Sequence, residues 1–315
     1  MSVPVAYTSI ILIWSTTPLA ISWSNDSLSP EAAVGLRMGI AALIGYGVLC
    51  VMRIPLVWSA EARRTYASSL MGVFGAMFCT YHAASYIPSG LISVLFALAP
   101  VCSNLFASLL LGRADFSVQR WVSFAVSFTG LSIICLDDWV IYGDGWIGVL
   151  LLLAAVCLYS LGGVLVQRAS YHGHPLSITV GTLVSSMPLF IGAWWLFDGQ
   201  VPVFEWHSPS PWAVLYLAVF GSLIGFAAYF FIVRTLGATA VAMVTLVTPV
   251  LALIFGNVLN GEQLTLQIVS GTACVLLGLI LYYRWGSQVG QSLDNGVSSD
   301  TVVDDTLIKP ADRAV

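Results

Sequence analysis

The feature that most constrains this chain is a succession of apolar runs, each about as long as a lipid bilayer is thick. A transmembrane helix needs about 20 predominantly apolar residues. Ten runs of this kind lie at residues 4–23, 31–51, 66–86, 89–111, 119–136, 146–166, 176–197, 212–233, 239–259 and 265–284. Turn-forming residues such as Asn25-Asp26 and Asn260-Gly261 separate them. Because backbone in lipid must satisfy its own hydrogen bonds, the runs predict helices.

The composition excludes a soluble protein. The chain has 315 residues, of which 58% are hydrophobic and only 8% are charged, and its mean hydropathy is +0.92. A soluble domain carries about 25% charged residues, so the polar surface needed to coat a globule of this size is missing. Ten spans would take about 200 residues, which leaves no room for a soluble catalytic domain. The sequence predicts an all-α integral membrane protein.

The basic residues predict which side of the membrane each loop occupies. Cytoplasmic loops carry an excess of Lys and Arg. With the N-terminus in the cytoplasm, ten of the eleven basic residues lie on the cytoplasmic side: Arg53, Arg63, Arg64, Arg113, Arg120, Arg168, Arg234, Arg284, Lys309 and Arg313. The outer loops then carry acidic residues and no basic one. This distribution predicts ten transmembrane helices with both termini cytoplasmic, followed by a disordered cytoplasmic tail over residues 287–315.

The chain contains an internal repeat. Residues 72–100 align without a gap on residues 221–249, with a matching first glycine and a matching mid-helix proline at the end, and Pro30 corresponds to Pro175. Two five-helix copies, residues 1–140 and 146–286, account for these matches. Because five is odd, the second copy must be inverted relative to the first. Inverted-topology repeats are typical of secondary transporters, whose binding site lies near the midplane between the halves.

Several short motifs carry a family resemblance. They are WSTTP at residues 14–18, LRMG at 36–39, YIPSG at 86–90, RTLGATAVA at 234–242 and GEQLT at 261–265. In their order and spacing they resemble the drug/metabolite transporter superfamily, and more narrowly its ten-helix EamA branch of bacterial metabolite exporters. The Tyr81-His82 pair and the many aromatic residues make the chain most similar to the aromatic and neutral amino-acid exporters of that branch. The resemblance implies a multi-pass protein of the bacterial cytoplasmic (inner) membrane.

The resemblance also implies a substrate cavity between the first, third and fourth helices of each copy. Its predicted lining residues are Trp14, Tyr81, His82, Phe96, Leu98, Pro100, Tyr159, Tyr229, Phe230, Thr245 and Pro249. From the residues alone, mid-helix prolines free backbone carbonyl groups that could receive an ammonium group, and the aromatic side chains suit an apolar substrate. Packing of kinked helices and contact of the aromatic rings with lipid explain the same residues without a substrate.

Two ionisable residues within the spans have open roles. His82 is the only histidine in a span, and no acidic residue lies near the centre of any span, so the sequence favours a facilitator or a weakly coupled exporter in which His82 binds substrate; a packed structural histidine is the alternative. Arg37 is the only basic residue in a span, where a cation costs about 2.5–3.5 kcal/mol. It is predicted to snorkel or pair structurally, or else to serve an outer gate or a substrate carboxylate. Glu262 is predicted to lie near the positive end of the last helix.

The remaining classes of function are disfavoured by what the sequence lacks. No HExxH motif, paired intramembrane aspartates or phosphate-binding loop points to an intramembrane enzyme, and no ring of charges points to an ion channel. We expect neither a cofactor nor a metal, and no nucleic-acid partner. The expected partners are a small-molecule substrate and the lipid bilayer, and a monomer is favoured over a dimer. The leading function is export of neutral amino acids by alternating access, and the alternative is export of drugs or other metabolites.

Overall fold

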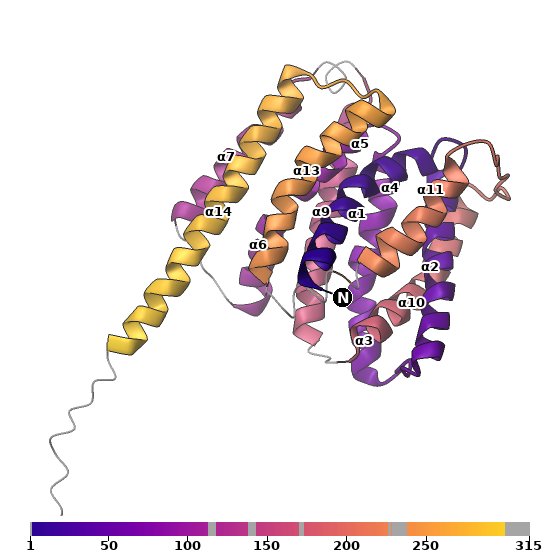
Figure 1. Cartoon of the computed structure of the whole chain (residues 1–315), viewed down its shortest axis with the longest axis horizontal. Helices are drawn as coiled ribbons and strands as arrows, with labels where there is room; N and C mark the ends of the chain where they lie inside the picture. The colour runs from indigo at the N-terminus through magenta and orange to yellow at the C-terminus, as the bar shows by residue number, and fades with distance from the viewer. Residues whose placement is uncertain are drawn as a thin grey trace, which may run out of the picture.

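The computed structural model describes residues 2–112, 118–137, 143–169, 173–225, 228 and 238–299, and within these ranges the regular structure is entirely helical. In chain order the elements are α1 (Val3–Ser24), α2 (Pro30–Met52), α3 (Ala60–Leu70), the π-helical segment η1 (Met71–Ala76), α4 (Met77–Ala83), α5 (Ser89–Phe96), α6 (Ala99–Leu111), α7 (Val118–Ile134), α9 (Gly145–Ala169), α10 (Pro175–Phe197), α11 (Ser210–Tyr216), the π-helical segment η2 (Leu217–Ile224), α13 (Ala238–Asn260) and α14 (Leu266–Ser299). Figure 1 shows them as one bundle, from which α14 projects.

Six of the described helical stretches are long and apolar enough to cross a bilayer. They are α1, α2, the α5–α6 stretch Ser89–Leu110, α9, α10 and Leu266–Arg284 of α14. Shorter apolar helices cover Trp121–Ile134, Ser210–Ile224 and Val247–Asn260. The prediction of an all-helical protein with many apolar spans is therefore confirmed. The total of ten helices and the side of the membrane that each terminus occupies stay predictions.

Proline sets the start of two long helices. Pro30 and Pro175 occupy the first helical position of α2 and α10, where a missing N–H costs nothing. The preceding residues cap the helices: Ser29 Oγ accepts from the Ala32 N–H at 3.2 Å, and His174 Nδ1 accepts from the Leu176 N–H at 3.2 Å. Both starts lie within one residue of the predicted positions.

The third and fourth predicted spans differ from the structure in instructive ways. The third begins at Ala60 rather than residue 66, because Ser59 caps the helix with Oγ 3.2 Å from the Ala62 N–H. Hydropathy alone leaves the beginning of this helix out of the predicted span, because it contains Arg63 and Arg64. The fourth is broken between Phe96 and Ala99, because Pro100 cannot donate a hydrogen bond to the preceding turn.

Two further segments depart from the expected ranges. The first part of the predicted span 212–233 is formed by α11 and η2. Beyond residue 225, only residue 228 of this span lies within the described residues. The last helix, α14, continues to Ser299, beyond the expected start of a disordered tail at residue 287. The chain has no proline between Pro249 and Pro310 to end that helix earlier. Residues 300–315 lie outside the described residues.

Helices α2 and α10 pack together along one side of the bundle (Figure 1). Their contact is reciprocal. A Cβ atom at Gly35 would lie 3.9 Å from Phe190 Cβ, and one at Gly45 would lie 2.8 Å from Val180 Cγ2. Residues 35 and 180 are 145 positions apart, and so are residues 45 and 190. If residues 145 positions apart are equivalent, the contact of residue 35 with residue 190 is therefore repeated, with the two helices exchanged, by the contact of residue 180 with residue 45.

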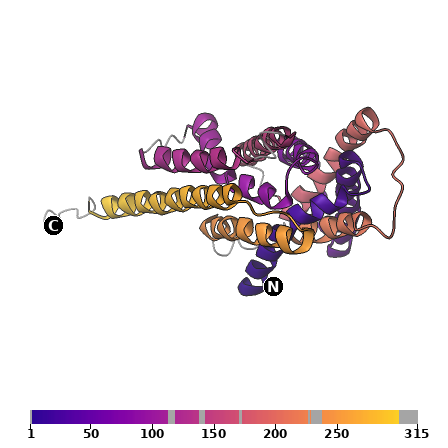
Figure 2. The ribbon, with the colours of Figure 1, turned by 90° about the horizontal axis from the view of Figure 1, so that it is seen from above.

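Helices α7 and α14 form a second close pair on the opposite side, side by side in Figures 1 and 2. A Cβ at Gly130 would collide with the Gly271 backbone, and a Cβ at Gly278 would lie 2.8 Å from the Ser123 carbonyl oxygen. Residues 130 and 278 are 148 positions apart, as are residues 123 and 271. This crossing is reciprocal too, and glycine at its centre lets the two backbones touch.

This packing predicts that the α7–α14 crossing is intolerant of even one methyl group. In Gly271→Ala the new Cβ would lie 2.5 Å from Ile134 Cγ1 and 2.6 Å from the Gly130 carbonyl oxygen, so we expect a loss of about 1–3 kcal/mol. Gly192→Ala on α10 is the matched control, because no atom lies within 4 Å of its added Cβ. Thermal unfolding of the two purified variants in detergent measures the difference. Equal unfolding midpoints would show that the crossing is looser than described.

Candidate functional site

Arg37 lies buried at the junction of several helices. Its side chain extends from α2 and is only 4% exposed. The Nε group donates to Ser222 Oγ on η2 at 3.2 Å, and one terminal nitrogen donates to Tyr81 Oη on α4 at 3.4 Å. The guanidinium carbon also lies 6.0 Å from the centroid of the Tyr81 ring, within range of a cation–π interaction. The guanidinium is therefore held by two hydroxyl groups and an aromatic ring.

No carboxylate neutralises Arg37 within the part of the chain that the structure describes. The Glu31 carboxylate, on the same helix, pairs with His82 instead. In the sequence, none of the fifteen acidic residues falls in the middle of a described apolar helix. Arg37 is about 10 Å along α2 from Pro30, well past the first turn. Burying a cation in such a helix without a counter-charge is costly, and residues of this kind often mark a functional site.

The space around the guanidinium is made by a glycine on η2. A Cβ atom at Gly221 would lie 3.2 Å from the second terminal nitrogen of Arg37 and 3.7 Å from Thr17 Oγ1 on α1. Thr17 itself donates to the Ile13 carbonyl at 2.7 Å, so its hydroxyl is held in the helix. Three elements, α2, α4 and η2, thus meet at the buried cation, and they come from both halves of the sequence.

The π-helical segments occur at corresponding places in the chain. The wider turns of η1 carry Gly72, and those of η2 carry Gly221, the two glycines that open the aligned stretches. A Cβ at Gly72 would lie 3.8 Å from the Tyr159 backbone on α9, so η1 approaches α9 closely. Because π-helical turns inside helices are frequent at functional sites, the position of η2 beside Arg37 is notable.

The predicted aromatic residues are divided between two places. The half-buried Trp14 packs against a buried cluster formed by Ala6, Ile10, Ala228 and Val244, and its indole nitrogen would lie 3.4 Å from a Cβ at Gly225. Tyr159 is 38% exposed, and its ring meets the Phe96 ring edge-on at 5.8 Å. Of Trp14, Tyr81 and Tyr159, it is Tyr81 whose side chain contacts Arg37.

The rest of the predicted lining is only partly described. Leu98 is buried, Pro100 is half-buried beside it, and Pro249 is buried within α13. Tyr229 and Phe230 lie outside the described residues, and so does the side chain of Thr245. A hydrogen bond from Ser160 Oγ to the Ala99 carbonyl at 3.1 Å joins α9 to the start of α6, next to the break at Leu98.

His82 has a carboxylate partner that the sequence did not suggest. Its Nε2 atom lies 2.9 Å from Glu31 Oε1, and its Nδ1 atom lies 2.9 Å from the Phe78 carbonyl oxygen. Glu31 is the second residue of α2, whereas His82 is near the end of α4. Hydropathy places both residues at the edges of spans. Only the packing of α2 against α4 brings them together.

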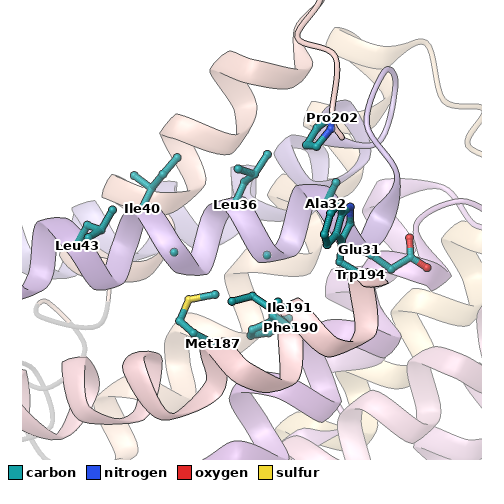
Figure 3. Close-up of a pocket in the computed structure, with 12 residues that line it drawn as sticks. Glu31, Ala32, Leu36, Ile40, Leu43, Met187, Phe190, Ile191, Trp194 and Pro202 are labelled. Atoms are coloured by element: carbon teal, nitrogen blue, oxygen red, sulfur yellow. The ribbon is translucent and has the colours of Figure 1, made fainter. Parts of the chain in front are cut away.

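A cavity of about 310 Å³ lies between α2 and α10 (Figure 3). It is lined by Glu31, Ala32, Gly35, Leu36, Gly39, Ile40, Leu43, Met187, Phe190, Ile191, Trp194 and Pro202, and none of these is a predicted substrate-binding residue. Figure 3 shows the Glu31 carboxylate at one end, beyond the row of apolar side chains. The cavity is therefore an apolar groove that the Glu31 carboxylate does not enter.

The Glu262 carboxylate caps α5 rather than the last helix. Its carboxylate accepts from the N–H groups of Ser89 at 2.9 Å and Gly90 at 3.2 Å, at the start of α5. The last helix, α14, is instead capped by Thr265, whose Oγ1 accepts from the Ile268 N–H at 3.2 Å. Glu262 thus precedes the last helix, as predicted, but its carboxylate serves α5, because α5 begins after a proline with its N–H groups free and directed at this carboxylate.

The Glu262 cap belongs to a chain of hydrogen bonds between helix ends. Asn260 donates to Glu262 Oε1 at 3.1 Å and accepts from the Trp23 indole N–H at 3.0 Å. Nearby, Thr265 donates to Asp137, which follows α7. These bonds connect the ends of α1, α5, α7 and α13 to the start of α14. The helix ends on this side of the protein are therefore fastened together.

Comparison with known proteins gives a consistent result. A family model described as the EamA-like transporter family matches residues 6–136 and 146–284. An uncharacterized transporter of Archaeoglobus fulgidus is 25% identical over 87% of this chain and 96% of its own length. The uncharacterized transporter YvbV of Bacillus subtilis is 23% identical, over 88% of this chain and 92% of its own. The uncharacterized inner membrane transporter YedA of Escherichia coli is 24% identical over 82% of each chain.

A solved crystal structure also resembles this chain. It covers 90% of this chain and 97% of its own, with a TM-score of 0.61 and 19% sequence identity. At 19% identity, this similarity is evidence for a shared fold and not for a shared function.

The cap on α5 gives a test of the network between helix ends. We expect Glu262→Ala to lower the free energy of unfolding by about 1–2 kcal/mol, because two backbone N–H groups lose a charged acceptor. The control is Glu205→Ala, at an exposed position in the segment between α10 and α11. Denaturation of both purified variants in the same detergent measures the difference. An unchanged midpoint for Glu262→Ala would mean that water or another group replaces the cap.

Proposed function

The chain belongs to the EamA-like transporter family, and from this premise we propose that it is a secondary transporter that exports small neutral metabolites, with aromatic and other neutral amino acids as the leading substrates. Its place among multi-pass membrane transporters rests on the family and on the apolar helices. The substrate, the direction of transport and the residues that bind the substrate are the parts that we propose.

The observation that carries the substrate class is the buried guanidinium of Arg37. It has hydroxyl partners on Tyr81 and Ser222 but no carboxylate partner among the described residues. A substrate carboxylate would supply the missing negative charge and could bind the planar guanidinium with two parallel hydrogen bonds. Neutral amino acids carry such a carboxylate and no net charge. Arg37 is therefore proposed as the anchor for the carboxylate, which favours the second of the two roles predicted for it.

The remainder of the proposed substrate path follows from the aromatic residues. Trp14, Tyr81, Phe96 and Tyr159 would face the apolar side chain of the substrate, and backbone carbonyls freed near the mid-helix prolines would receive its ammonium group. The proposed path also includes residues from both halves that are buried, half-buried or outside the described part: His82, Leu98, Pro100, Tyr229, Phe230, Thr245 and Pro249. This path would open alternately to each side of the membrane.

The architecture that we propose for this activity is ten helices in two inverted repeats, residues 1–140 and 146–286, with both termini cytoplasmic. The reciprocal contacts of α2 with α10 and of α7 with α14 support a two-fold relationship, because each contact recurs with the two segments exchanged. The two separate matches to the family model agree with it. The proposed setting is the bacterial inner membrane, with the protein acting as a monomer in the bilayer and residues 287–315 as a cytoplasmic extension.

Counterflow tests the carboxylate anchor. In proteoliposomes loaded with unlabelled phenylalanine, we expect uptake of radiolabelled phenylalanine that 3-phenylpropionate inhibits and phenylalaninol, which lacks the carboxylate, does not. Arg37→Ala should reduce exchange by about 100-fold, because losing a charge-assisted hydrogen bond costs about 1.5–3 kcal/mol and leaves a buried carboxylate unpaired. Arg37→Lys should retain part of the exchange.

Expression and folding are controlled by comparing the detergent unfolding midpoints of the same variants. Exchange by wild-type protein that phenylalaninol blocks as well as phenylalanine does would contradict a carboxylate anchor. Transport of lipophilic drugs without any amino-acid exchange would favour the drug-exporter alternative.

A further inference from the structure

Two apolar grooves lie on either side of one row of side chains on α2. The first is the cavity of about 310 Å³ between α2 and α10. The second has a volume of about 230 Å³ and lies between α2 and α11. Leu36 and Ile40 line both grooves, and Figure 3 shows these two side chains pointing the same way from α2. They therefore form a ridge with an apolar groove on each side.

The segment between α10 and α11 contributes to both grooves. Its Pro202 lines the first groove, and its Phe204 and Trp206 line the second. The same segment is tied to the start of α2, because Ser29 Oγ donates to Asp198 at 2.6 Å and these residues cap α2 and α10. The two grooves therefore share one end, at the start of α2.

The first groove is about as long as one leaflet of a bilayer is deep. It extends along α2 from Ala32 to Leu43, a distance of about 16 Å at 1.5 Å per residue. The hydrocarbon core of a bilayer is about 30 Å thick, so one leaflet contributes about 15 Å. Trp194 lies at the Ala32 end (Figure 3), and tryptophan is enriched where hydrocarbon meets headgroups. The groove therefore matches the depth of one layer of acyl chains.

The pair of grooves suits a lipid with two acyl chains. Apart from Glu31 at the end of the first groove, the lining side chains are apolar or aromatic. A phospholipid carries two chains on one headgroup, and the ridge of Leu36 and Ile40 would separate them. A helix of a second protein chain, about 10 Å across, is too wide to enter either groove.

The shared end of the grooves is acidic. Residues 25–31 and 198–209 contain no Lys or Arg, and their carboxylates belong to Asp26, Glu31, Asp198 and Glu205. Glu31 and Asp198 are already engaged in hydrogen bonds. Glu205 is exposed, and it stands in the chain between Phe204 and Trp206, which line the second groove. An anionic headgroup would be repelled here, and an ammonium group would be attracted.

The aromatic rings beside Glu205 suit the same ammonium group. The Phe204 and Trp206 rings stack with their centroids 5.7 Å apart, and the Trp206 and Trp212 rings meet edge-on at 6.4 Å. Both tryptophans are more than half exposed, at 65% and 58%. The face of an aromatic ring attracts a cation, and a carboxylate accepts hydrogen bonds from one. Rings and carboxylate together favour a headgroup with a positively charged nitrogen.

We infer that this face of α2 binds a phospholipid with an ethanolamine headgroup. One acyl chain lies in each groove, astride Leu36 and Ile40, and the ammonium group meets Glu205 and the Trp206 ring. Ethanolamine is favoured over choline because only its nitrogen bears hydrogens that a carboxylate can accept. This lipid site goes beyond the proposed transport activity and shares no residue with the proposed substrate path.

Native mass spectrometry of the delipidated protein in detergent tests the headgroup. The protein is titrated with phosphatidylethanolamine, phosphatidylcholine and phosphatidylglycerol that carry identical acyl chains. For the first bound lipid, the wild type should bind phosphatidylethanolamine about fivefold more tightly than the other two, the upper range for one exposed charge pair. Glu205→Gln and Trp206→Leu should each remove most of this preference. Trp195→Leu is the control, because Trp195 is 72% exposed on α10 and lines neither groove.

A second pair of variants tests the acyl chains. Gly39 lines the first groove, and a Cβ there would lie 3.7 Å from Met187 Sδ, so Gly39→Leu fills the groove without a clash at Cβ. It should weaken binding of all three lipids by about tenfold, the effect of leaving about two CH₂ groups unburied. Gly47→Leu on the same helix is the control, because no atom lies within 4 Å of its added Cβ. The unfolding midpoint of each variant without lipid shows whether it is folded.

Three results would overturn the lipid site. The first is equal affinity of the wild type for the three lipids, or a preference that survives both Glu205→Gln and Trp206→Leu. The second is equal lipid affinity of folded Gly39→Leu and Gly47→Leu. The third is a dimer that excludes lipid and that Gly39→Leu abolishes, which would show that a second copy covers this face. None of these measurements involves transport, so the lipid site and the proposed function stand or fall separately.

Discussion

The cost of placing a charge inside a membrane organises this protein. Nearly all basic residues in the sequence lie beside spans rather than in them, and the acidic residues lie in loops, at helix ends or in the tail. Arg37 is the exception, and the structure places it where α2, α4 and η2 meet. Such a cation is stable only with several partners, and its recorded partners are neutral. The proposed substrate class and path both depend on this positive charge having only neutral partners among the described residues.

The second constraint is close contact between helices. Reciprocal glycine contacts join α2 to α10 and α7 to α14, and they bring together segments about 145 residues apart. In lipid, association of helices relies on such packing rather than on the hydrophobic effect. Side-chain bonds join several helix ends, including the Glu262 cap on α5 and the contact of Glu31 with His82.

Hydropathy and turn chemistry predict most of the helices, because span length and proline position are local properties. The starts of α2 and α10 at Pro30 and Pro175 are examples. The site is less accessible to sequence reasoning. Arg37 can be singled out as the lone basic residue in a span, but its contacts with Tyr81 and Ser222 depend on which helices meet. Glu31 is overlooked for the same reason: it looks like an ordinary helix-start carboxylate until α4 packs against α2.

The central claim, that a substrate carboxylate binds the guanidinium of Arg37, can be measured without relying on transport rates. Solid-state NMR of the protein in lipid would use phenylalanine labelled with carbon-13 in its carboxyl group and protein labelled with nitrogen-15 in its arginine side chains. The account predicts strong dipolar coupling between the two labels, at hydrogen-bonding distance, which disappears in Arg37→Lys protein. Bound phenylalanine whose carboxyl carbon shows no coupling to any guanidinium nitrogen would contradict it.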